Sequence, residues 1–512
     1  MRKTILGSNV LSWGLHVVFA LLALVPVLLA LVYSADYDIF YVPFASWFVF
    51  GLSALILILD GLALCLRVRL HKASQLHAHL TQDPIRDEIP VIYGHKFLDM
   101  AEFLPIIQSL FGRLPDVRSI QLEPLPGGYG GSQTVLVKLQ QKSDASMLPR
   151  SFVVKLGDRR EMAGERDKFQ RHVRWRLTRA ATLLGYAEWE GWAGTAYEFV
   201  GIDPDYEIQS FYQFYRGHAA VEVSALVDET YARLDQAWYR RGKTHPMELY
   251  CEYSLLRKKQ QSIVEHIGEL VDEDDPYRRN FTVIEEKLQP HLKPRFCSEM
   301  DVPWHDPVAF LRTWPRSNRV VPIHRSTVHG DLNSRNVLVE IGAGGQKFTW
   351  FIDFSHTGNG LSQARTEERL REGIPVDGET GHTLRDFCRL EADVKFILTR
   401  LWDEGDLNLA VAFERELLKQ GVTMKDWQAV SLHAEALRDR RFRKAWQVVR
   451  TIRSYAANYL GNTDDWRPYC LSLLHATLPI VYYHPDQFER TACERQQKRY
   501  ALISAGMLCD LL

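Results

Sequence analysis

The sequence predicts an α+β protein whose folded part follows two transmembrane helices. Three observations predict this class. Two long apolar segments lie within residues 1–72, and short apolar runs separated by glycine turns, which are typical of strands, occupy residues 120–200. Apolar residues at three- and four-residue intervals, which are typical of helices, dominate residues 201–512. Residues 73–119 are predicted to be a linker that docks on the folded part.

Charge and cysteine usage argue against nucleic-acid binding, a disulfide framework and a zinc site. The chain has 512 residues, with 62 Lys and Arg against 63 Asp and Glu, so its formal net charge is −1. This balance gives no overall basic field, and no nucleic-acid partner is expected. The seven cysteines are odd in number and lack CxxC spacing, which favours reduced, buried thiols over a disulfide framework or a zinc site.

Residues 10–33 and 44–66 are the predicted transmembrane helices. Each has about 23 residues, which as a helix is roughly 35 Å, enough to cross a hydrocarbon core of about 30 Å. A cleaved signal peptide would be shorter and would not be followed at once by a second span. Basic residues flank the pair, and the turn between the spans has none. The positive-inside rule therefore places both termini and the folded domain in the cytoplasm, with the lipid bilayer as a partner.

The segment 326–354, STVHGDLNSRNVLVEIGAGGQKFTWFIDF, carries the polar residues with the most chemical content. Asp331 opens a loop that Asn336 closes, and two apolar runs around a glycine-rich turn predict a hairpin that ends on Asp353. Asp331 can accept the proton of an attacking hydroxyl, and Asn336 and Asp353 offer hard oxygen ligands for Mg²⁺.

This motif, HGD-x4-N followed by an apolar strand ending in IDF, resembles the choline-kinase and aminoglycoside-phosphotransferase branch of the kinase fold. The resemblance implies a bilobal protein-kinase-like fold, with an amino-terminal lobe at 120–200 and a helical carboxy-terminal lobe at 201–512. It makes Asp331 the catalytic base, Asn336 a catalytic and metal-binding residue, and Asp353 the ligand of Mg²⁺ on the phosphates of ATP.

The same resemblance extends more loosely to the strand-rich region. It assigns Lys155 to the α- and β-phosphates of ATP and a glutamate of the next helix to orient it, with Glu165 preferred and Glu161 in reserve. It places Glu198 and Val200 at the hinge that meets adenine. Four glycines between two apolar runs form a tight turn when taken alone and a phosphate-covering loop within the family, although their spacing is not GxGxxG: Gly127, Gly128, Gly130 and Gly131.

Four predictions concern the rest of the carboxy-terminal region. Residues 206–292 are predicted to be helical. Residues 361–380 are predicted to be a polar surface loop beside the active site, either a lid or substrate determinant or a mobile decoration. Three interpretations of the Arg-rich helix 438–453 compete. A solvated face is the default, and the alternatives are a contact with anionic lipid and a pocket for an acidic substrate or partner. Asp386 matches an acid that in kinase-fold proteins bonds to the catalytic loop.

The resemblance implies a membrane-anchored ATP-dependent phosphotransferase of the aminoglycoside and choline kinase type, acting on a hydroxyl of an unidentified small molecule. The alternative is a nucleotide-binding regulatory module with little or no turnover, whose protein partners belong to a membrane-associated signalling or defence complex. The enzyme is favoured by four intact residues, Lys155, Asp331, Asn336 and Asp353. The irregular glycine loop and DFS in place of DFG favour the module. A protein kinase is a third reading, weakened because Gly330 stands where protein kinases usually carry Arg.

Overall fold

The computed structural model describes residues 91–512 apart from several gaps, of which the longer are 94–100, 126–131, 142–150, 199–206, 254–262, 271–306, 314–319 and 420–434. The chain divides into two compact units, Met1–Pro84 and Ile85–Leu512, and the described residues all belong to the second. The predicted membrane spans therefore lie outside the described residues. Among the helices that are described, none is both long enough and apolar enough to cross a bilayer.

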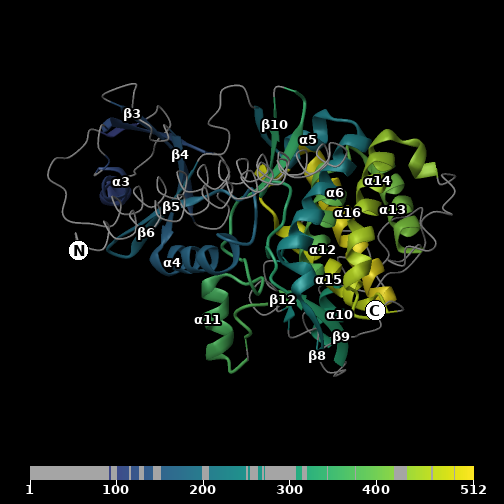
Figure 1. The fold of residues 1–512 in the computed structure, drawn as a ribbon. Coiled ribbons are helices and arrows are strands. Elements are labelled where there is room, and N and C mark those ends of the chain that lie inside the picture. The colour runs from purple at the N-terminus through teal and green to yellow at the C-terminus, as the bar shows by residue number, and fades with distance from the viewer. Residues whose placement is uncertain are drawn as a thin grey trace, which may run out of the picture. The chain divides into compact units, whose positions relative to one another are not determined.

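The amino-terminal lobe of the second unit is built on a six-stranded sheet (Figure 1). Its strand order is β1-β2-β3-β4-β6-β5, in which β1 runs parallel to β2 and every other neighbouring pair is antiparallel. The strands are β1 Val91–Tyr93, β2 Val117–Pro124, β3 Gln133–Gln141, β4 Ser151–Asp158, β5 Leu183–Trp189 and β6 Trp192–Glu198.

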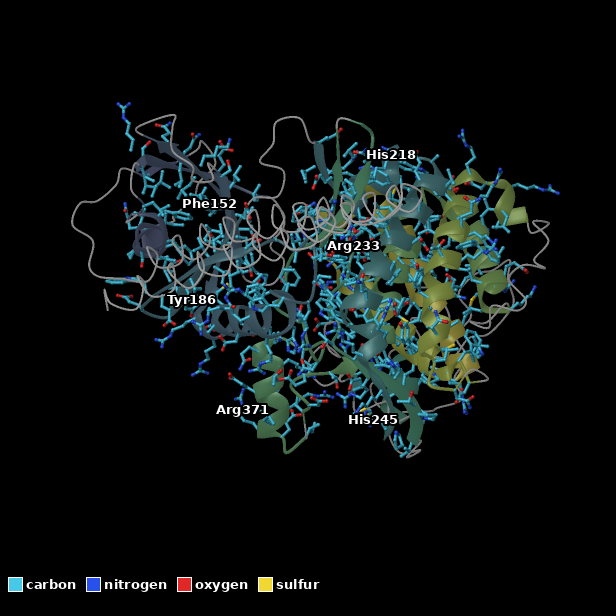
Figure 2. All side chains as sticks on the ribbon, viewed as in Figure 1. Phe152, Tyr186, His218, Arg233, His245 and Arg371 are labelled. Carbon is cyan, nitrogen blue, oxygen red and sulfur yellow. The ribbon has the colours of Figure 1, made fainter. Side chains whose placement is uncertain are left out.

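Two helices, α3 (Leu104–Phe111) and α4 (Arg159–Lys168), cover opposite faces of this sheet. Successive residues of a strand point to opposite faces. A Cβ atom on Gly194 of β6 would lie 2.7 Å from a side chain of α3, whereas the neighbouring Thr195 contacts a methionine sulfur of α4 at 4.0 Å. Figure 2 shows Phe152, which is fully buried, among the side chains of this lobe.

The carboxy-terminal lobe is mainly helical and carries two small antiparallel sheets, with orders β11-β10-β7 and β12-β9-β8. The strands are β7 Glu207–Ser210, β8 Lys243–Glu248, β9 Val320–Ser326, β10 Val337–Ile341, β11 Lys347–Phe351 and β12 Gly381–His382. The helices are α5 Phe211–Gly217, α6 Ala220–Ala237, α10 Pro307–Thr313, α11 Gln363–Arg371, α12 Leu384–Asp393, α13 Glu404–Lys419, α14 Arg440–Ala456, α15 Arg467–Thr477 and α16 Thr491–Leu511. Short 3₁₀ or π turns are Ala101–Phe103, Phe169–Val173, Tyr239–Arg241, Val394–Leu398, Glu435–Arg438, Ala457–Tyr459, Leu478–Tyr482 and Pro485–Gln487.

This architecture confirms the α+β prediction and the order of a sheet lobe before a helical lobe. The prediction that 206–292 is helical holds for α5 and α6 and is wrong for β7 and β8. Each of these strands pairs with a strand far along the chain, β7 with β10 and β8 with β9. The stabilising partners are therefore not visible in the local sequence.

The prediction of a polar surface loop at 361–380 is also wrong in part. Residues Gln363–Arg371 form helix α11, and Arg369 on this helix is buried. The helix has no apolar stripe of its own, so its stability depends on contacts with the rest of the molecule. Figure 1 shows α11 beside α4 of the amino-terminal lobe.

The Arg-rich helix is α14, and the prediction that its basic residues face solvent is wrong for Arg453. The Arg453 guanidinium is fully buried and donates two hydrogen bonds to Glu391 of α12, at 2.8 and 2.5 Å. Beside this pair, buried Lys395 donates to Glu414 at 2.7 Å. Burial alone would raise the pKa of Glu391, but Arg453 outweighs it and holds that pKa below its usual value.

His382 of β12 is a buried histidine that the fold keeps neutral. Its side chain is 0% exposed, and Nδ1 lies 2.7 Å from the hydroxyl of Tyr253. Burial, together with the positive charge of Arg385 and Arg325, lowers the pKa of His382 from 6.5 to about 3. The unfolded chain therefore takes up this proton at a higher pH than the folded chain does.

This difference predicts an acid-sensitive fold. The stability that neutral His382 contributes is fully present above pH 6.5 and is lost as pH falls toward 3, because the proton binds the unfolded state first. At pH 4.5 the loss from this residue is about 3 kcal/mol. The free energy of urea unfolding at pH 7 and pH 4.5 is expected to differ less in His382→Gln than in the wild type. His484→Gln, at a side chain 64% exposed, should show the wild-type difference, and an equal difference in all three proteins would contradict the prediction.

Candidate active site

The β10–β11 hairpin brings Asn336 and Asp353 to the same end of one sheet. Val337 pairs with Phe351 in register, and the pairing continues one step further because Ile352 N donates to the carbonyl oxygen of Asn336 at 3.1 Å. Asn336 immediately precedes β10, and Asp353 follows β11 by two residues. The antiparallel register therefore places the two predicted metal ligands next to each other.

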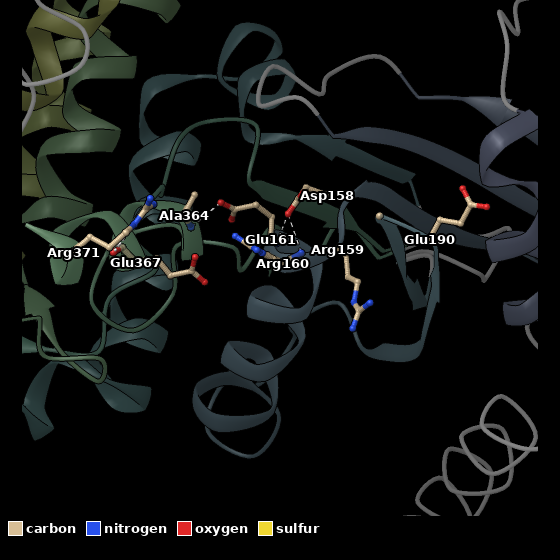
Figure 3. A pocket seen from close by; sticks show the side chains of 9 residues that line it. Asp158, Arg159, Arg160, Glu161, Glu190, Ala364, Glu367 and Arg371 are labelled. Atoms are coloured by element: carbon tan, nitrogen blue, oxygen red, sulfur yellow. Dashed lines mark hydrogen bonds between the residues drawn. The ribbon is translucent and has the colours of Figure 1, made fainter.

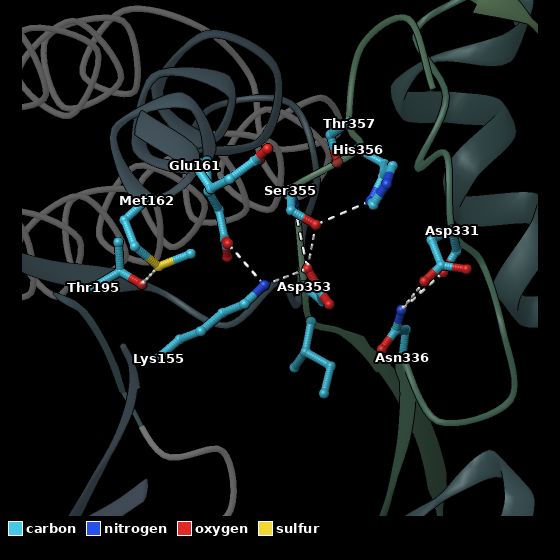
Figure 4. Close-up of polar contacts among 12 residues, drawn as sticks. Lys155, Glu161, Met162, Thr195, Asp331, Asn336, Asp353, Ser355, His356 and Thr357 are labelled. Atoms are coloured by element: carbon cyan, nitrogen blue, oxygen red, sulfur yellow. Dashed lines mark hydrogen bonds and ion pairs between the residues drawn. The ribbon is translucent and has the colours of Figure 1, made fainter. Parts of the chain in front are cut away.

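Asp331 lies in the loop between β9 and β10, and hydrogen bonds within that loop hold it. Asn336 Nδ2 donates to the Asp331 carbonyl oxygen at 2.8 Å and to its Oδ2 at 3.3 Å, and Asn333 Nδ2 donates to the same Oδ2 at 3.0 Å. These hydrogen bonds join Asp331, the predicted base, directly to Asn336, a predicted metal ligand. Figure 4 shows this pair facing the site.

Gly330, one residue before Asp331, has a backbone conformation that excludes a side chain. Its φ is +85°, and a Cβ atom would lie 2.5 Å from the carbonyl oxygen of His356. A residue with a side chain would be strained in both respects. The glycine that the sequence carries in place of the arginine of protein kinases is therefore a requirement of this loop.

Asp386 on α12 fixes the backbone just before Asp331. Its carboxylate accepts hydrogen bonds from His329 N at 2.7 Å, from Gly330 N at 2.8 Å and from the Tyr239 hydroxyl at 2.9 Å. These contacts confirm the predicted bond of Asp386 to the loop. Burial raises the pKa of its carboxyl.

Lys155 of β4 bonds to one carboxylate from each lobe. Its ammonium lies 2.9 Å from Glu165 Oε2 on α4 and 2.8 Å from Asp353 Oδ1 after β11 (Figure 4). Glu165 is buried, and its other oxygen accepts from the Tyr197 hydroxyl at 2.5 Å. Burial would lower the pKa of Lys155, but Asp353 and Glu165 outweigh it and raise that pKa. Against the opposing effect of burial, Lys155 in turn holds the pKa of Asp353 well below its usual range.

The structure thus places Glu165, and not the reserve Glu161, against Lys155. Glu161 points to the outer side of α4, where its two carboxylate oxygens accept from Gln363 N at 3.2 Å and Ala364 N at 2.8 Å. Glu165 follows Glu161 by four residues on the same helix, and the register of α4 was the feature that the sequence left open.

The remaining contacts of Asn336 and Asp353 suit a hard cation such as Mg²⁺. Because Asn336 Nδ2 donates to Asp331, the amide presents Oδ1 as its other polar atom. Asp353 Oδ1 accepts from Lys155 and from the Ser355 hydroxyl at 2.7 Å, and among the described residues Oδ2 accepts no hydrogen bond. One amide oxygen and one carboxylate oxygen are therefore available at this end of the hairpin, and these are ligands that Mg²⁺ prefers.

Arg389 is a residue of this site that the sequence analysis did not identify. Its Nε donates to Asp331 Oδ1 at 2.9 Å, and its NH1 donates to Asp393 Oδ1 at 2.7 Å. Asp393 in turn accepts from Ser334 N at 2.8 Å within the Asp331 loop. The spacing of Asp386, Arg389 and Asp393 along one face of α12 is the signal that could have revealed them.

The charge of Arg389 affects the acid–base properties of Asp331. Burial would raise the pKa of Asp331, but Arg389 and His356 outweigh it, so this pKa lies below its ordinary value. Asp331 is therefore ionised at neutral pH and can accept a hydrogen bond from a hydroxyl group. It is a weaker base than an isolated carboxylate.

Five other predicted site residues cannot be placed. Val200 and the four glycines Gly127, Gly128, Gly130 and Gly131 lie outside the described residues. The glycines fall in sequence between β2 and β3, which pair as antiparallel neighbours from Pro124 and Val135 onward. Glu198 is the last residue of β6, is half-buried, and pairs in register with Phe152.

Comparisons with known proteins give one family match and several similar structures. The model of "Ternary complex associated domain 9" matches residues 118–259, a range that contains Lys155 and Glu165 and ends before Asp331. No curated protein sequence matches the chain. The chain is similar to crystal structures of aminoglycoside phosphotransferase APH(4)-Ia. The apo form of a thermostable mutant is 14% identical, with 73% of this chain and 96% of that chain covered and a TM-score of 0.30. A ternary complex of a thermostable mutant with AMP-PNP and hygromycin B is 13% identical, with 73% of this chain and 95% of that chain covered and a TM-score of 0.32. Because these identities and TM-scores are low, the roles of the site residues are argued from the contacts within this structure alone.

Proposed function

We propose that this protein is a membrane-anchored, ATP-dependent phosphotransferase that transfers the γ-phosphoryl group of ATP to a hydroxyl of a small molecule. The observation that carries the proposal is the double contact of Lys155 with Glu165 and Asp353, made beside Asp331 and Asn336 at one end of the β10–β11 hairpin. Phosphoryl transfer depends mainly on positioning and charge neutralisation, and this arrangement supplies both.

The residues divide the work between the two substrates. Lys155, positioned by Glu165, binds the ATP phosphates, and Asn336 and Asp353 would hold Mg²⁺, which supplies neutralising charge to those phosphates. Asp331 accepts a hydrogen bond from the acceptor hydroxyl and takes its proton as the bond to the phosphoryl group forms. Because the pKa of Asp331 is lowered, its larger contribution is to orient the hydroxyl.

Different features of the chain support a small-molecule phosphoryl acceptor and a membrane anchor. Gly330 leaves the Asp331 loop without the arginine by which protein kinases sense activation, which favours a small-molecule acceptor. The predicted spans at 10–33 and 44–66 and their flanking charges support a domain held at the cytoplasmic face of a membrane.

A second candidate function is a nucleotide-binding regulatory module with little or no turnover, which works with protein partners at a membrane. Three contacts favour it. Arg389 donates to Asp331 Oδ1, and both Lys155 and Ser355 donate to Asp353 Oδ1, so both reactive carboxylates already carry strong partners. The family match to a domain described as associated with ternary complexes points the same way.

Transfer of label from γ-labelled ATP by the full-length chain separates these functions. The reaction would contain Mg²⁺ and a small-molecule cell extract, with Asp331→Ala in parallel. Label in a small product, lost in the variant, is the expected result. Label on protein would instead indicate a protein kinase. Binding of Mg–ATP without transfer would identify the regulatory module, and no binding would refute the site assignment.

A further inference from the structure

The segment that follows Asp353, residues 355–379, folds back over the outer face of α4. Glu161, Gly164 and Lys168 lie on this face at intervals of three and four residues, so they form one stripe along the helix. Glu165, which binds Lys155, lies on the neighbouring buried face with Met162. One short helix therefore faces the phosphate-binding lysine on one side and segment 355–379 on the other.

Glu161 fastens the amino-terminal end of this stripe to α11. Its carboxylate accepts from the backbone N–H groups of Gln363 and Ala364 in the first turn of α11, while Ser362 caps the same helix by accepting from Arg365 N at 3.3 Å. A carboxylate at a helix amino terminus satisfies N–H groups that have no partner in the helix and interacts favourably with the helix dipole. Figure 3 shows Glu161 and Ala364 at the edge of a hollow between α4 and α11.

Lys168 fastens the other end of the stripe to the loop that carries Asp353. Its ammonium donates to the carbonyl oxygen of Ser355 at 2.7 Å and also to that of Leu361. It thereby joins both ends of the loop between Asp353 and α11. Burial lowers the pKa of Lys168 to about 8, against the opposing effect of nearby carboxylates that include Glu161. An ammonium in this environment needs its two carbonyl partners.

Close packing and an ion pair complete the contact. A Cβ atom on Gly164 would lie 2.7 Å from the side chain of Gln363, so α4 and α11 approach as closely as a glycine permits. Beyond α4, Arg171 pairs with Glu379 at 2.9 Å, although both side chains are more than half exposed and the pair adds little stability.

We propose that Glu161 and Lys168 are positioning residues, which hold α4 against segment 355–379 and so keep Glu165 in contact with Lys155. The contacts form a closed ring. Lys155 binds Glu165 on α4, Lys168 on the same helix binds Ser355, and Asp353, two residues before Ser355, binds Lys155. This ring makes segment 355–379 a buttress of the phosphate site, and the inference rests on the proposed function for the use of that site.

The test compares Lys168→Met and Lys168→Arg with the wild-type full-length chain. Lys168→Met keeps most of the unbranched side chain and removes its charge and its donors. Amide hydrogen exchange within α4, measured without nucleotide, is expected to become roughly tenfold faster in Lys168→Met. The affinity for Mg–ATP, measured by calorimetry, should fall about tenfold, because hydrogen bonds from a charged group are lost. Lys168→Arg should restore most of both, since it keeps the charge and the donors.

Glu161→Gln provides a second variant that leaves the buried face of α4 untouched, and it should show the same two changes to a smaller extent. Asp167→Asn is the matched control. Asp167 lies on the same helix, is 61% exposed and, within the part of the chain that the structure describes, pairs with its neighbour Arg166 alone, so wild-type exchange and affinity are expected. Unchanged α4 exchange in both Lys168→Met and Glu161→Gln would overturn the proposal. Failure of the wild type to bind Mg–ATP would refute the proposed function instead, and the exchange comparison would still decide the role of the buttress.

Discussion

Asp331→Asn and Asp353→Asn are expected to separate chemistry from nucleotide binding. In Asp331→Asn the amide can no longer accept the proton, and the rate of phosphoryl transfer should fall by about 10²- to 10⁴-fold. Mg–ATP affinity should stay within about twofold, because Asp331 touches neither Lys155 nor Asp353 and the amide oxygen of an asparagine can still accept the hydrogen bond from Arg389. Arg389 keeps its bond to Asp393 in this variant, so the loop remains anchored.

In Asp353→Asn both phosphoryl transfer and Mg–ATP binding should be lost together. The substitution removes a metal-binding carboxylate and the partner of Lys155 at once, and the transfer rate should fall by at least about 10²-fold. Asn suits the backbone at this position, where φ is +60°, because Asn tolerates the left-handed region better than most residues. Calorimetric titration with Mg–ATP and initial rates with labelled ATP distinguish the two variants. Wild-type Mg–ATP affinity in Asp353→Asn would contradict the assignment of Asp353.

Arg453→Met should destabilise the carboxy-terminal lobe by about 3–5 kcal/mol. The substitution leaves the fully buried carboxylate of Glu391 without its main partner, and an uncompensated buried charge has a cost of this size. The free energy of urea unfolding, monitored by the fluorescence of buried Trp238, measures the effect. Arg450→Met, on an exposed part of the same helix, should change stability by less than about 0.5 kcal/mol.

Replacing both partners tests whether charge is the cause. In Glu391→Gln with Arg453→Met the unpaired charge is gone, so the double variant should be more stable than Arg453→Met alone. Additive losses in the double variant would show instead that the shape and packing of Arg453 stabilise the lobe, and that its ion pair does not.

The predictable parts of the structure are those whose stabilising contacts are local in sequence. The hairpin around Asn336 and Asp353 was visible because two apolar runs flank a glycine-rich turn, and these runs pair as β10 and β11. The apolar residues of α12 follow the three- and four-residue spacing that predicts helices within 201–512, and Leu384, Phe387 and Leu390 are buried. The contact of Asp386 with the Asp331 loop follows once that helix is placed.

The parts that escaped prediction depend on partners distant in the chain. α11 has a polar sequence, and its first turn is held by Glu161, about two hundred residues earlier. β8 contains Pro246, which argues against a strand, yet it pairs with β9 on the edge of its sheet. Arg453 resembles any surface arginine, although it follows buried Val449 by four residues and so falls on the apolar face of α14. That spacing was available in the sequence, but burial of the charge depends on Glu391 and on the carbonyl oxygen of Leu417, which lie on other helices.

The register between β10 and β11 sets the relative positions of Asn336 and Asp353 in the proposed site. Val337, Val339 and Phe351 are buried in the observed pairing. A slip of one residue would turn their side chains to the opposite face and move Asp353 by roughly 3.3 Å relative to Asn336. Burial of these hydrophobic side chains thus stabilises the same register that brings the two proposed oxygen ligands to one end of the hairpin. A molecule in which this hairpin has mispaired would not bring Asn336 and Asp353 together, so it would lack the proposed site altogether.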